Sequence, residues 1–304
     1  MRKLRILVTG DTGLLGGNIT RTRSEKYDII GVALENNPHR GIDHRTADLC
    51  MDNYCSTIVE EVRPDIIINA AAYLGVDNCE EHPDKAYIVN TLLPINLAKY
   101  AEKYHSHLIH ISTDAFYYGA PGNMCSETVI PHVRNVYGET KLEAEKQVLK
   151  YERTTVLRTN IYGYNLMNKL SQGEWILYSL LNNQTLHMFV DAETSGILVN
   201  DLIDVIDQVI KAHTYGLYNA GSSGTITRHE FAMALRDTFG IGTGNIVEAR
   251  LEEHSYVARR SHNTGMDNTR IKDALGTRIP TPVECIEHFY ALYKEGYHER
   301  LRKP

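Results

Sequence analysis

Three glycines at positions 10, 13 and 16 stand between an apolar run and an amphipathic one, and they constrain the fold more than any other feature. Residues 4–9 are typical of a buried strand, and residues 14–26 of a helix. Between such elements the first glycine allows a tight turn, the second lets backbone approach a pyrophosphate, and the third lets helix pack closely on strand. The helix N-terminus would present N–H groups and a positive dipole end to phosphate. The arrangement predicts a dinucleotide-binding loop, and a glycine-rich turn without a ligand is the alternative.

The rest of the first half alternates short apolar runs with longer amphipathic ones. Continuous apolar strands between amphipathic helices indicate a parallel sheet covered on both faces. The expected fold class is therefore doubly wound α/β, a Rossmann-type sheet with a smaller C-terminal lobe. The expected strands cover residues 4–9, 28–34, 65–70, 108–112 and 154–158, and the expected helices cover 14–26, 51–63, 84–103 and 139–150.

After about residue 160 the pattern becomes irregular. Thr227, with Glu230 three residues later, has the form of a capping box at a helix start. We predict a dinucleotide-binding domain over residues 1–160 and a mainly substrate-binding lobe over 161–304, with some segments returning to the first domain. The expected elements are helices over 174–181, 199–212, 227–239 and 281–296, a loop over 163–173, strand and loop over 186–195, and a strand entering a turn over 216–221.

Composition narrows the function classes. The chain has 304 residues, 42% of them hydrophobic and 23% charged, which is ordinary for a globular protein. A formal net charge of −6 gives no bulk electrostatic case for binding nucleic acid. The five cysteines include no C-x-x-C pair, which favours a reducing cytoplasm, and no window holds the roughly 18 apolar residues of a membrane span. The fourteen histidines have no recognisable ligand spacing, so no metal site is expected.

Tyr137 and Lys141 form a Y-x-x-x-K pair that a helix would place on one face, one turn apart. A phenol is a poor acid at neutral pH, and a nearby ammonium or an oxidised nicotinamide ring lowers its pKa. The lysine can also hold the nicotinamide ribose. Ser112, Thr113 and Asp114 end the preceding strand, at the edge where doubly wound folds bind ligands. A hydroxyl there can hold a substrate carbonyl oxygen beside the tyrosine, so the motifs together predict hydride-transfer chemistry.

The G-x-x-G-x-x-G spacing resembles that of the extended short-chain dehydrogenases/reductases. Asp48 and Leu49 follow a short third strand, where that family places an Asp near the adenine. Residues 69–72 match its N-A-A-A motif, which lines the cofactor, and Asn90 falls where the family has an Asn in the following helix. The resemblance implies a cofactor site formed by Gly10, Thr12, Gly13, Leu14, Leu15, Gly16, Asp48, Leu49, Ala70, Ala71, Ala72, Asn90, Tyr137 and Lys141.

The choice between NAD and NADP depends on residues at the end of the second strand. NAD-preferring members carry an acidic residue near position 33, where this chain has Ala33. Glu35 comes two residues later and is within reach of a ribose, whereas His39 and Arg40 are within reach of a 2′-phosphate. The sequence favours NADP(H) slightly, with NAD(H) as the alternative.

Three stretches resemble the dTDP-4-dehydrorhamnose reductases in particular, and the resemblance covers essentially the whole chain. They are S-T-D-x-aromatic followed by Y-G-x-T-K-L-x-x-E, N-A-A-A-Y-x-x-V-D-x-x-E at 69–80, and residues 258–267, which are similar to R-P-x-N-S-x-L-D. The resemblance implies reduction at C4 of a nucleotide-linked 4-keto-6-deoxy sugar, in deoxysugar or surface polysaccharide biosynthesis, by a protein that is often a homodimer. It implies catalytic roles for Thr113, Tyr137 and Lys141, and substrate contacts from Val76, Asp114, Tyr137, Asn160 and Arg260.

Departures from that family's pattern lie on the substrate side and leave the sugar and the nucleotide open. Leu74 replaces a small polar residue, Ser261 replaces proline, and Asn160-Ile161 replaces Ser-Trp. Ala115 supplies neither the acid of a 4,6-dehydratase nor the acid/base group of a fucose-synthase-like epimerase-reductase, which disfavours both. A nucleotide-sugar 4-epimerase uses the same triad, and the regulatory subunit of methionine adenosyltransferase resembles these reductases. An epimerase and a non-catalytic cofactor-binding regulatory subunit are therefore the alternatives.

Overall fold

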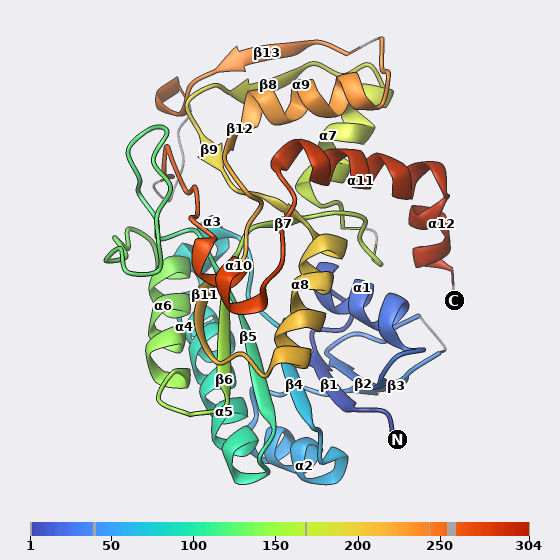
Figure 1. The fold of residues 1–304 in the computed structure, drawn as a ribbon, viewed down its shortest axis with the longest axis vertical. Helices are drawn as coiled ribbons and strands as arrows, with labels where there is room; N and C mark the ends of the chain where they lie inside the picture. Colours follow the sequence, from blue (N-terminus) through green and yellow to red (C-terminus); the bar gives the residue numbers. More distant parts are fainter. Residues whose placement is uncertain (1, 39–40, 168, 243, 254–259, 304) are drawn as a thin grey trace.

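A seven-stranded sheet forms the centre of the computed structural model, which describes residues 2–38, 41–167, 169–242, 244–253 and 260–303. The strand order is β11-β6-β5-β4-β1-β2-β3, and every neighbouring pair runs parallel (Figure 1). The predicted doubly wound α/β fold is confirmed. The strands are β1 (Arg5–Thr9), β2 (Asp28–Ala33), β3 (Asp43–Thr46), β4 (Ile66–Asn69), β5 (His107–Thr113), β6 (Thr154–Thr159) and β11 (Gly216–Asn219).

Helices cover both faces of this sheet, as its alternating buried side chains require. Leu7 belongs to the buried cluster on the face covered by α2 (Asp52–Val62) and α5 (Leu93–Lys103). The neighbouring Ile6 and Val8 belong to the cluster on the opposite face, formed with α1 (Leu14–Arg23) and α8 (Val199–Ala212). Helix α6 (Val136–Val148) packs beside α5, and α10 (Thr269–Leu275) contacts α8 and β11.

The predicted helix over 84–103 is divided into three parts. Helix α4 (Pro83–Tyr87) passes into a π-helical segment, η1 (Ile88–Leu92), and then into α5. Pro94 lies directly after this segment and has no N–H to donate to the preceding turn. The π turn is a single-turn bulge within an otherwise continuous helix. The short helix α3 (Val76–Glu81) precedes α4 and was not predicted.

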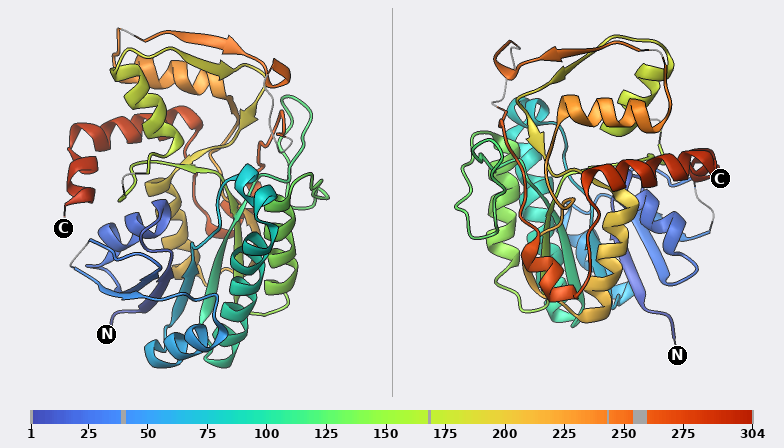
Figure 2. Two further views of the ribbon diagram at one scale, coloured as in Figure 1. Left: turned by 180° about the vertical axis from the view of Figure 1, so that it is seen from behind. Right: turned by 45° about the horizontal axis from the view of Figure 1, so that its top comes forward.

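Most of the second half lies over the carboxyl ends of the sheet strands (Figures 1 and 2). β8 pairs with β13, β9 with β12, and β7 with β10. β13, α10 and α12 were not predicted. The elements of this half, besides α8, α10 and β11, are β7 (Ile161–Tyr162), α7 (Gln172–Leu181), β8 (Leu186–Phe189), β9 (Glu193–Thr194), β10 (Ile197–Leu198), β12 (Ile226–Thr227), α9 (Arg228–Thr238), β13 (Ile246–Ala249), the 3-10 turn η2 (Leu251–Glu253), α11 (Pro282–Lys294) and α12 (Tyr297–Arg302).

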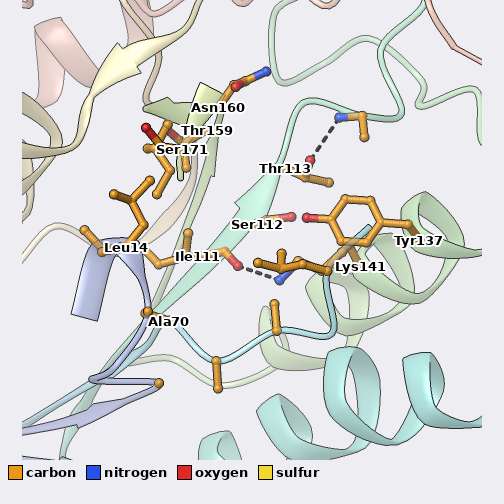
Figure 3. Close-up of a pocket in the computed structure, with 18 of the residues that line it drawn as sticks. Leu14, Ala70, Ile111, Ser112, Thr113, Tyr137, Lys141, Thr159, Asn160 and Ser171 are labelled. Atoms are coloured by element: carbon orange, nitrogen blue, oxygen red, sulfur yellow. Dashed lines mark hydrogen bonds between the residues drawn. The ribbon is translucent and has the colours of Figure 1, made fainter. Parts of the chain in front are cut away.

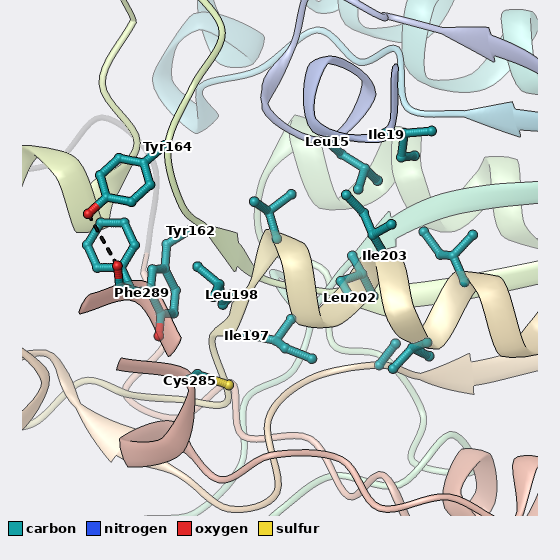
Figure 4. Packing of buried hydrophobic residues seen from close by; sticks show 14 of the residues in the cluster. Leu15, Ile19, Tyr162, Tyr164, Ile197, Leu198, Leu202, Ile203, Cys285 and Phe289 are labelled. Carbon is teal, nitrogen blue, oxygen red and sulfur yellow. Dashed lines mark hydrogen bonds between the residues drawn. The ribbon is translucent and has the colours of Figure 1, made fainter. Parts of the chain in front are cut away.

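One continuous core joins these upper elements to the sheet. Leu15 and Ile19 of α1 pack in the same buried cluster as Leu202 of α8 and Phe289 of α11 (Figure 4). The rings of Tyr164 and Phe289 stack with centroids 4.3 Å apart. The upper elements are therefore fixed over the sheet by shared apolar packing. Within the part of the chain that the structure describes, no helix combines the length and the apolar character that crossing a membrane requires.

The glycine loop depends on the missing side chains at positions 10 and 16. Gly10 has a φ of 68°, in the left-handed region, and an added Cβ would lie 2.9 Å from the Cα of Ala71. A Cβ at Gly16 would lie 2.3 Å from the carbonyl oxygen of Gly10. Both contacts are shorter than a real Cβ tolerates, so α1 begins directly against the loop and beside the segment that follows β4.

Replacing Gly16 with alanine should lower the free energy of unfolding by about 1–3 kcal/mol, because the new methyl group overlaps the Gly10 carbonyl. Gly242→Ala is the matched control, since nothing lies within 4 Å of its added Cβ, and its change should stay within about 0.5 kcal/mol. Urea unfolding followed by circular dichroism measures both. Equal stability of Gly16→Ala and the parent chain would contradict the close contact.

Candidate active site

A cavity of about 1090 Å³ lies along the carboxyl ends of β1, β2, β4, β5 and β6. Its lower wall is the glycine loop and the sheet edge, and its upper wall includes Arg228 at the start of α9 and Arg260. The predicted cofactor residues that line it are Gly10, Thr12, Gly13, Leu14, Leu15, Asp48, Leu49, Ala70, Ala71, Ala72, Tyr137 and Lys141. Gly16 and Asn90 are not among the residues that line it.

The end of the cavity next to α1 fits a pyrophosphate. Gly13 is the N-cap residue of α1 and has extended backbone, and no side chain caps this helix. The backbone N–H groups of its first turn are therefore left to bind an anion at the positive end of the helix dipole. Beyond β2 the cavity is lined by Glu35, whereas His39 and Arg40 lie outside the described residues.

Asn90 is buried in the π-helical segment and acts on the site through its neighbours. Its Oδ1 accepts a hydrogen bond from the N–H of Tyr73 at 2.8 Å, and its Nδ2 donates to the carbonyl of Tyr73 at 3.1 Å. Its Nδ2 also donates to Oγ1 of Thr140 at 3.3 Å. Asn90 thus ties the loop after β4, which carries Ala70–Ala72, to the helix that carries Tyr137.

Helix α6 begins at Val136, three residues before the predicted start. Asn135 caps it by accepting a hydrogen bond from the N–H of Gly138 at 2.8 Å. The carboxylate of Glu80, on α3, accepts the N–H of Val136 at 2.9 Å. A carboxylate and an Asn cap both stabilise a helix N-terminus. They place Tyr137 in the first turn of α6.

The predicted catalytic residues meet at the end of β5 (Figure 3). Thr113 Oγ1 accepts a hydrogen bond from the N–H of Ala115 at 3.1 Å and is also hydrogen-bonded to the Tyr137 side chain. Lys141 is almost fully buried, and its Nζ donates to the carbonyl of Ile111 at 2.6 Å. The three side chains therefore converge from one strand and one helix onto the same part of the cavity.

Burial controls the protonation of this group. Desolvation raises the pKa of Tyr137 to about 12, although its hydrogen bond with Thr113 acts in the opposite direction. Desolvation lowers the pKa of Lys141 to about 8, and the charge of Glu145 opposes that change. The sequence predicted that a nearby ammonium lowers the pKa of the tyrosine, but desolvation is the largest effect and raises that pKa. Tyr137 is consequently a protonated phenol at neutral pH, the form that can donate a proton.

The predicted substrate residues Val76, Asp114, Asn160 and Arg260 all line the cavity. Asp114 is buried, and its Oδ2 accepts a hydrogen bond from Nδ2 of Asn160 at 2.9 Å. Burial raises the pKa of the Asp114 carboxyl, against the effect of hydrogen bonds from Thr264 and Asn160. Arg260 pairs with Asp77 of α3 at 3.1 Å.

A match to the family model described as RmlD substrate binding domain covers residues 4–294. The chain belongs to this family. The dTDP-4-dehydrorhamnose reductase of Aggregatibacter actinomycetemcomitans is 27% identical over 292 residues, which cover 90% of this chain and 93% of that protein. Methionine adenosyltransferase 2 subunit beta of Xenopus laevis is 27% identical over 287 residues, 91% of this chain and 84% of that protein. The crystal structure of dTDP-4-dehydrorhamnose reductase from Bacillus anthracis in complex with NADP has a TM-score of 0.86 at 24% identity and covers 96% of this chain and 99% of that one.

The resemblance inferred from the motifs is therefore confirmed. In this RmlD-family chain, part of the motif at residues 258–267 has a structural role. Ala258 and Arg259 lie outside the described residues. Asn263 is fully buried, and its Nδ2 donates to the carbonyls of Ala120 and Asn123 at 2.7 and 2.9 Å. Its Oδ1 accepts the N–H of Gly265 at 2.7 Å. Asn263 thus fixes the loop after β5, while Arg260 lines the cavity.

Sequence reasoning missed Arg228, the first residue of α9. Its side chain lines the cavity, contacts Gln172, and lies within electrostatic reach of Asp114 and Arg260. Burial and the like charge of Arg260 lower its pKa, and the negative charge of Asp114 opposes them. The capping box at Thr227 predicted a helix start here, but the direction of a first-turn side chain cannot be read from a capping motif.

Metal binding has no support among the residues placed by the structure, where no group of three or more His, Cys, Asp or Glu is arranged to hold an ion. His107 and His110 are buried within β5. His107 Nε2 hydrogen-bonds Oγ1 of Thr155 at 2.7 Å, and His110 Nδ1 lies 3.0 Å from Nδ2 of Asn69. Both histidines therefore serve packing within the sheet.

Replacing Asn90 with alanine should cost about 1–3 kcal/mol of stability and also weaken NADP(H) binding, because buried hydrogen bonds to the loop after β4 are lost. Chemical unfolding and a fluorescence titration with NADPH measure the two effects. Asn182→Ala, at an exposed helix end, is the control and should change neither. Weaker binding at unchanged stability would instead assign Asn90 to direct cofactor contact.

Proposed function

We propose that this chain is an NAD(P)H-dependent oxidoreductase that reduces the C4 keto group of a nucleotide-linked 4-keto-6-deoxy sugar, in deoxysugar or surface polysaccharide biosynthesis. The observation that carries the proposal is the convergence of Thr113, Tyr137 and Lys141 in the cavity that also contains the glycine loop. Membership of the RmlD family and the similarity to dTDP-4-dehydrorhamnose reductases over nine-tenths of the chain support it.

The cofactor would be held along the lower wall of the cavity. The first turn of α1 would bind the pyrophosphate, residues 70–72 would lie along the nicotinamide half, and Asp48 would lie near the adenine. When bound, NAD(P)H supplies the hydride. The NADP in the related Bacillus anthracis structure supports NADP(H) as the preferred cofactor, whereas Glu35 at the end of β2 supports NAD(H) as the alternative.

The catalytic side chains divide the remaining chemistry between them. Thr113 accepts the N–H of Ala115, and its own hydroxyl proton, which is directed at the Tyr137 oxygen, would be shared with the substrate carbonyl oxygen placed between them. Tyr137, protonated because burial raises its pKa to about 12, gives its proton to that oxygen as negative charge develops. Lys141 keeps positive charge beside the phenol, stabilises the phenolate that proton transfer leaves, and would hold the nicotinamide ribose.

The sugar nucleotide would lie between the sheet and the upper elements. Val76, Asp114, Asn160 and Arg260 would contact it, and Arg228 adds a second cation to that wall. This placement supports the assignment of residues 161–304 to a substrate-binding lobe, with β11 and α8 returning to the domain of residues 1–160. A homodimer and a cytoplasmic location stay predictions, as does the absence of a nucleic-acid or membrane partner.

Neither alternative function is favoured. A cofactor-binding regulatory subunit does not need an assembled Thr–Tyr–Lys group, and this chain has one. A 4-epimerase would use the same three residues, but the similarity over nearly the full length is to reductases.

The test of the proposed function is oxidation of NADPH and NADH, followed by absorbance, with dTDP-, GDP-, CDP- and UDP-linked 4-keto-6-deoxy sugars. Turnover with one nucleotide class would establish a C4 reductase and identify both substrate and cofactor. Confirmed cofactor binding with no turnover on any of these substrates would refute the proposal and favour an epimerase or a regulatory protein.

Tyr137→Phe should lower kcat by at least about 10²-fold, because the proton donor is lost. The fold and the affinity for NADP(H) should stay unchanged, since the ring remains in place. Steady-state kinetics, circular dichroism and a cofactor titration check the three expectations. Near-parental activity in this variant would rule out Tyr137 as the acid.

Arg228→Gln should raise KM for the nucleotide-sugar about 10-fold or more and leave the affinity for NADPH unchanged, because the lost charge faces the substrate wall. Arg236→Gln is the control on the same helix, where the arginine pairs with the exposed Asp237. The measurements are KM for the nucleotide-sugar and the dissociation constant for NADPH in both variants. A KM in Arg228→Gln that matches the control would show that Arg228 does not contact the substrate.

A further inference from the structure

Glu145 lies one turn after Lys141 on α6 and is buried. Its carboxylate accepts a hydrogen bond from the Ser112 hydroxyl of β5 at 2.5 Å. Arg158 of β6 binds both its oxygens, with Nη2 donating at 2.6 Å and Nε at 3.1 Å. A buried carboxylate is therefore fixed by the strand that carries Thr113 and by the next strand of the sheet.

The arginine extends this contact towards the substrate side. Arg158 Nη1 donates to the hydroxyl of Tyr117 at 2.6 Å, and Tyr117 donates to Oδ1 of Asn219, on β11, at 2.9 Å. Asn219 Nδ2 donates to the carbonyls of Cys125 and Asp267 at 2.8 and 3.0 Å. One buried polar chain thus runs from the catalytic helix to the loop after β5 and to the segment that follows Arg260, which lines the cavity.

The charges around Lys141 come from three elements. Glu145 lies on its own helix, His110 faces it from β5, and Arg158 lies behind Glu145 on β6. Burial lowers the pKa of His110 well below its usual value, so at neutral pH it contributes no charge. Tyr137 is a neutral phenol. Two cations and one carboxylate are left, and without the carboxylate two buried cations would share the site.

We infer that Glu145, held by Arg158 and Ser112, is a positioning residue that sets a buried carboxylate one helical turn from Lys141 and holds α6 against the end of β5. This inference rests on the proposed function, which gives Lys141 its role. It adds that Glu145 is the residue that maintains Lys141 in that role. Lys141 Nζ donates one hydrogen bond to the carbonyl of Ile111. The hydrogen bond of Glu145 with Ser112 attaches the same helix to the next residue of β5. Two adjacent attachments fix the distance between Tyr137 and Thr113.

The test compares Glu145→Gln with Glu143→Gln, an exposed carboxylate on the same helix. In Glu145→Gln, kcat should fall about 10- to 100-fold because the catalytic groups lose their alignment. The alkaline limb of the kcat–pH profile should move about one unit to lower pH, because Lys141 loses its proton earlier. The pH dependence of NADPH binding should move in the same direction. Glu143→Gln should match the parent chain in all three.

Arg158→Gln distinguishes an effect of the Glu145 charge from an effect of weaker packing around the site. It removes a buried cation and leaves the carboxylate of Glu145 in place, hydrogen-bonded to Ser112, so the alkaline limb should stay or rise. The double variant Glu145→Gln/Arg158→Gln removes both buried charges together and leaves neither of them unpaired, so it remains testable where the single Glu145 variant fails to fold. Its alkaline limb should fall below that of Arg158→Gln. An equal downward shift in Arg158→Gln and Glu145→Gln, or a double variant whose alkaline limb matches that of Arg158→Gln, would overturn the inference.

NADPH binding distinguishes this inference from the proposed function, because it needs no sugar substrate. A parent chain that binds NADPH but reduces none of the sugars would refute the proposed function. If the pH dependence of binding still shifted in Glu145→Gln, the role of Glu145 would stand. If it did not shift, that role would be refuted separately.

Discussion

The contact between Gly16 and the carbonyl of Gly10 is the constraint on which the rest of the site depends. It allows α1 to begin directly at the loop, so that the first-turn N–H groups face the cavity instead of standing a residue further back. The same lack of a Cβ at Gly10 brings the segment after β4 within 2.9 Å of the loop position that a side chain would fill. The edge of the sheet thus becomes a backbone-lined surface, which suits a large dinucleotide better than side chains would.

Catalytic geometry in this fold is maintained by residues that do not line the cavity. Glu80 accepts the first N–H of α6, Asn90 ties that helix to the loop after β4, and Glu145 attaches it to β5. Each of these side chains satisfies buried polar groups that would otherwise cost free energy, so alignment of the site and stability of the fold have a common cause. Some residues of the family motifs therefore hold the site in place, and others line the cavity where ligands would bind.

Features that depend on local pattern could be predicted from the sequence. Apolar runs identified the main strands, and α8 occupies the predicted range because its apolar residues keep a strict helical period. The triad was predictable because strand ends meet at one edge in a parallel sheet. The start of α6 was placed too late because the local cap by Asn135 was overlooked and because its acidic partner on α3 is a tertiary feature. The position of Arg228 in the cavity and the hydrogen bonds of Asn263 to the loop after β5 depend on which segments of the chain pack against each other. A single sequence does not indicate that packing. The pKa of Tyr137 was misjudged because spacing indicates neighbours but not burial.

The two ends of the cavity differ in how they can evolve. On the proposed cofactor side, the cavity is lined by the glycine loop and by the small side chains of Ala70, Ala71 and Ala72, where a larger residue would fill the space. On the substrate side, Asp114 is buried under Asn160 and faces the charge of Arg228, with Arg260 nearby. A buried carboxyl that depends on a nearby cation and on hydrogen bonds is sensitive to any change in its partners. The departures at Leu74, Asn160 and Ser261 fall on that side and line the same cavity. These residues form the wall on which the proposed substrate would lie, while the residues proposed to carry out the reduction lie on the strand and helix below.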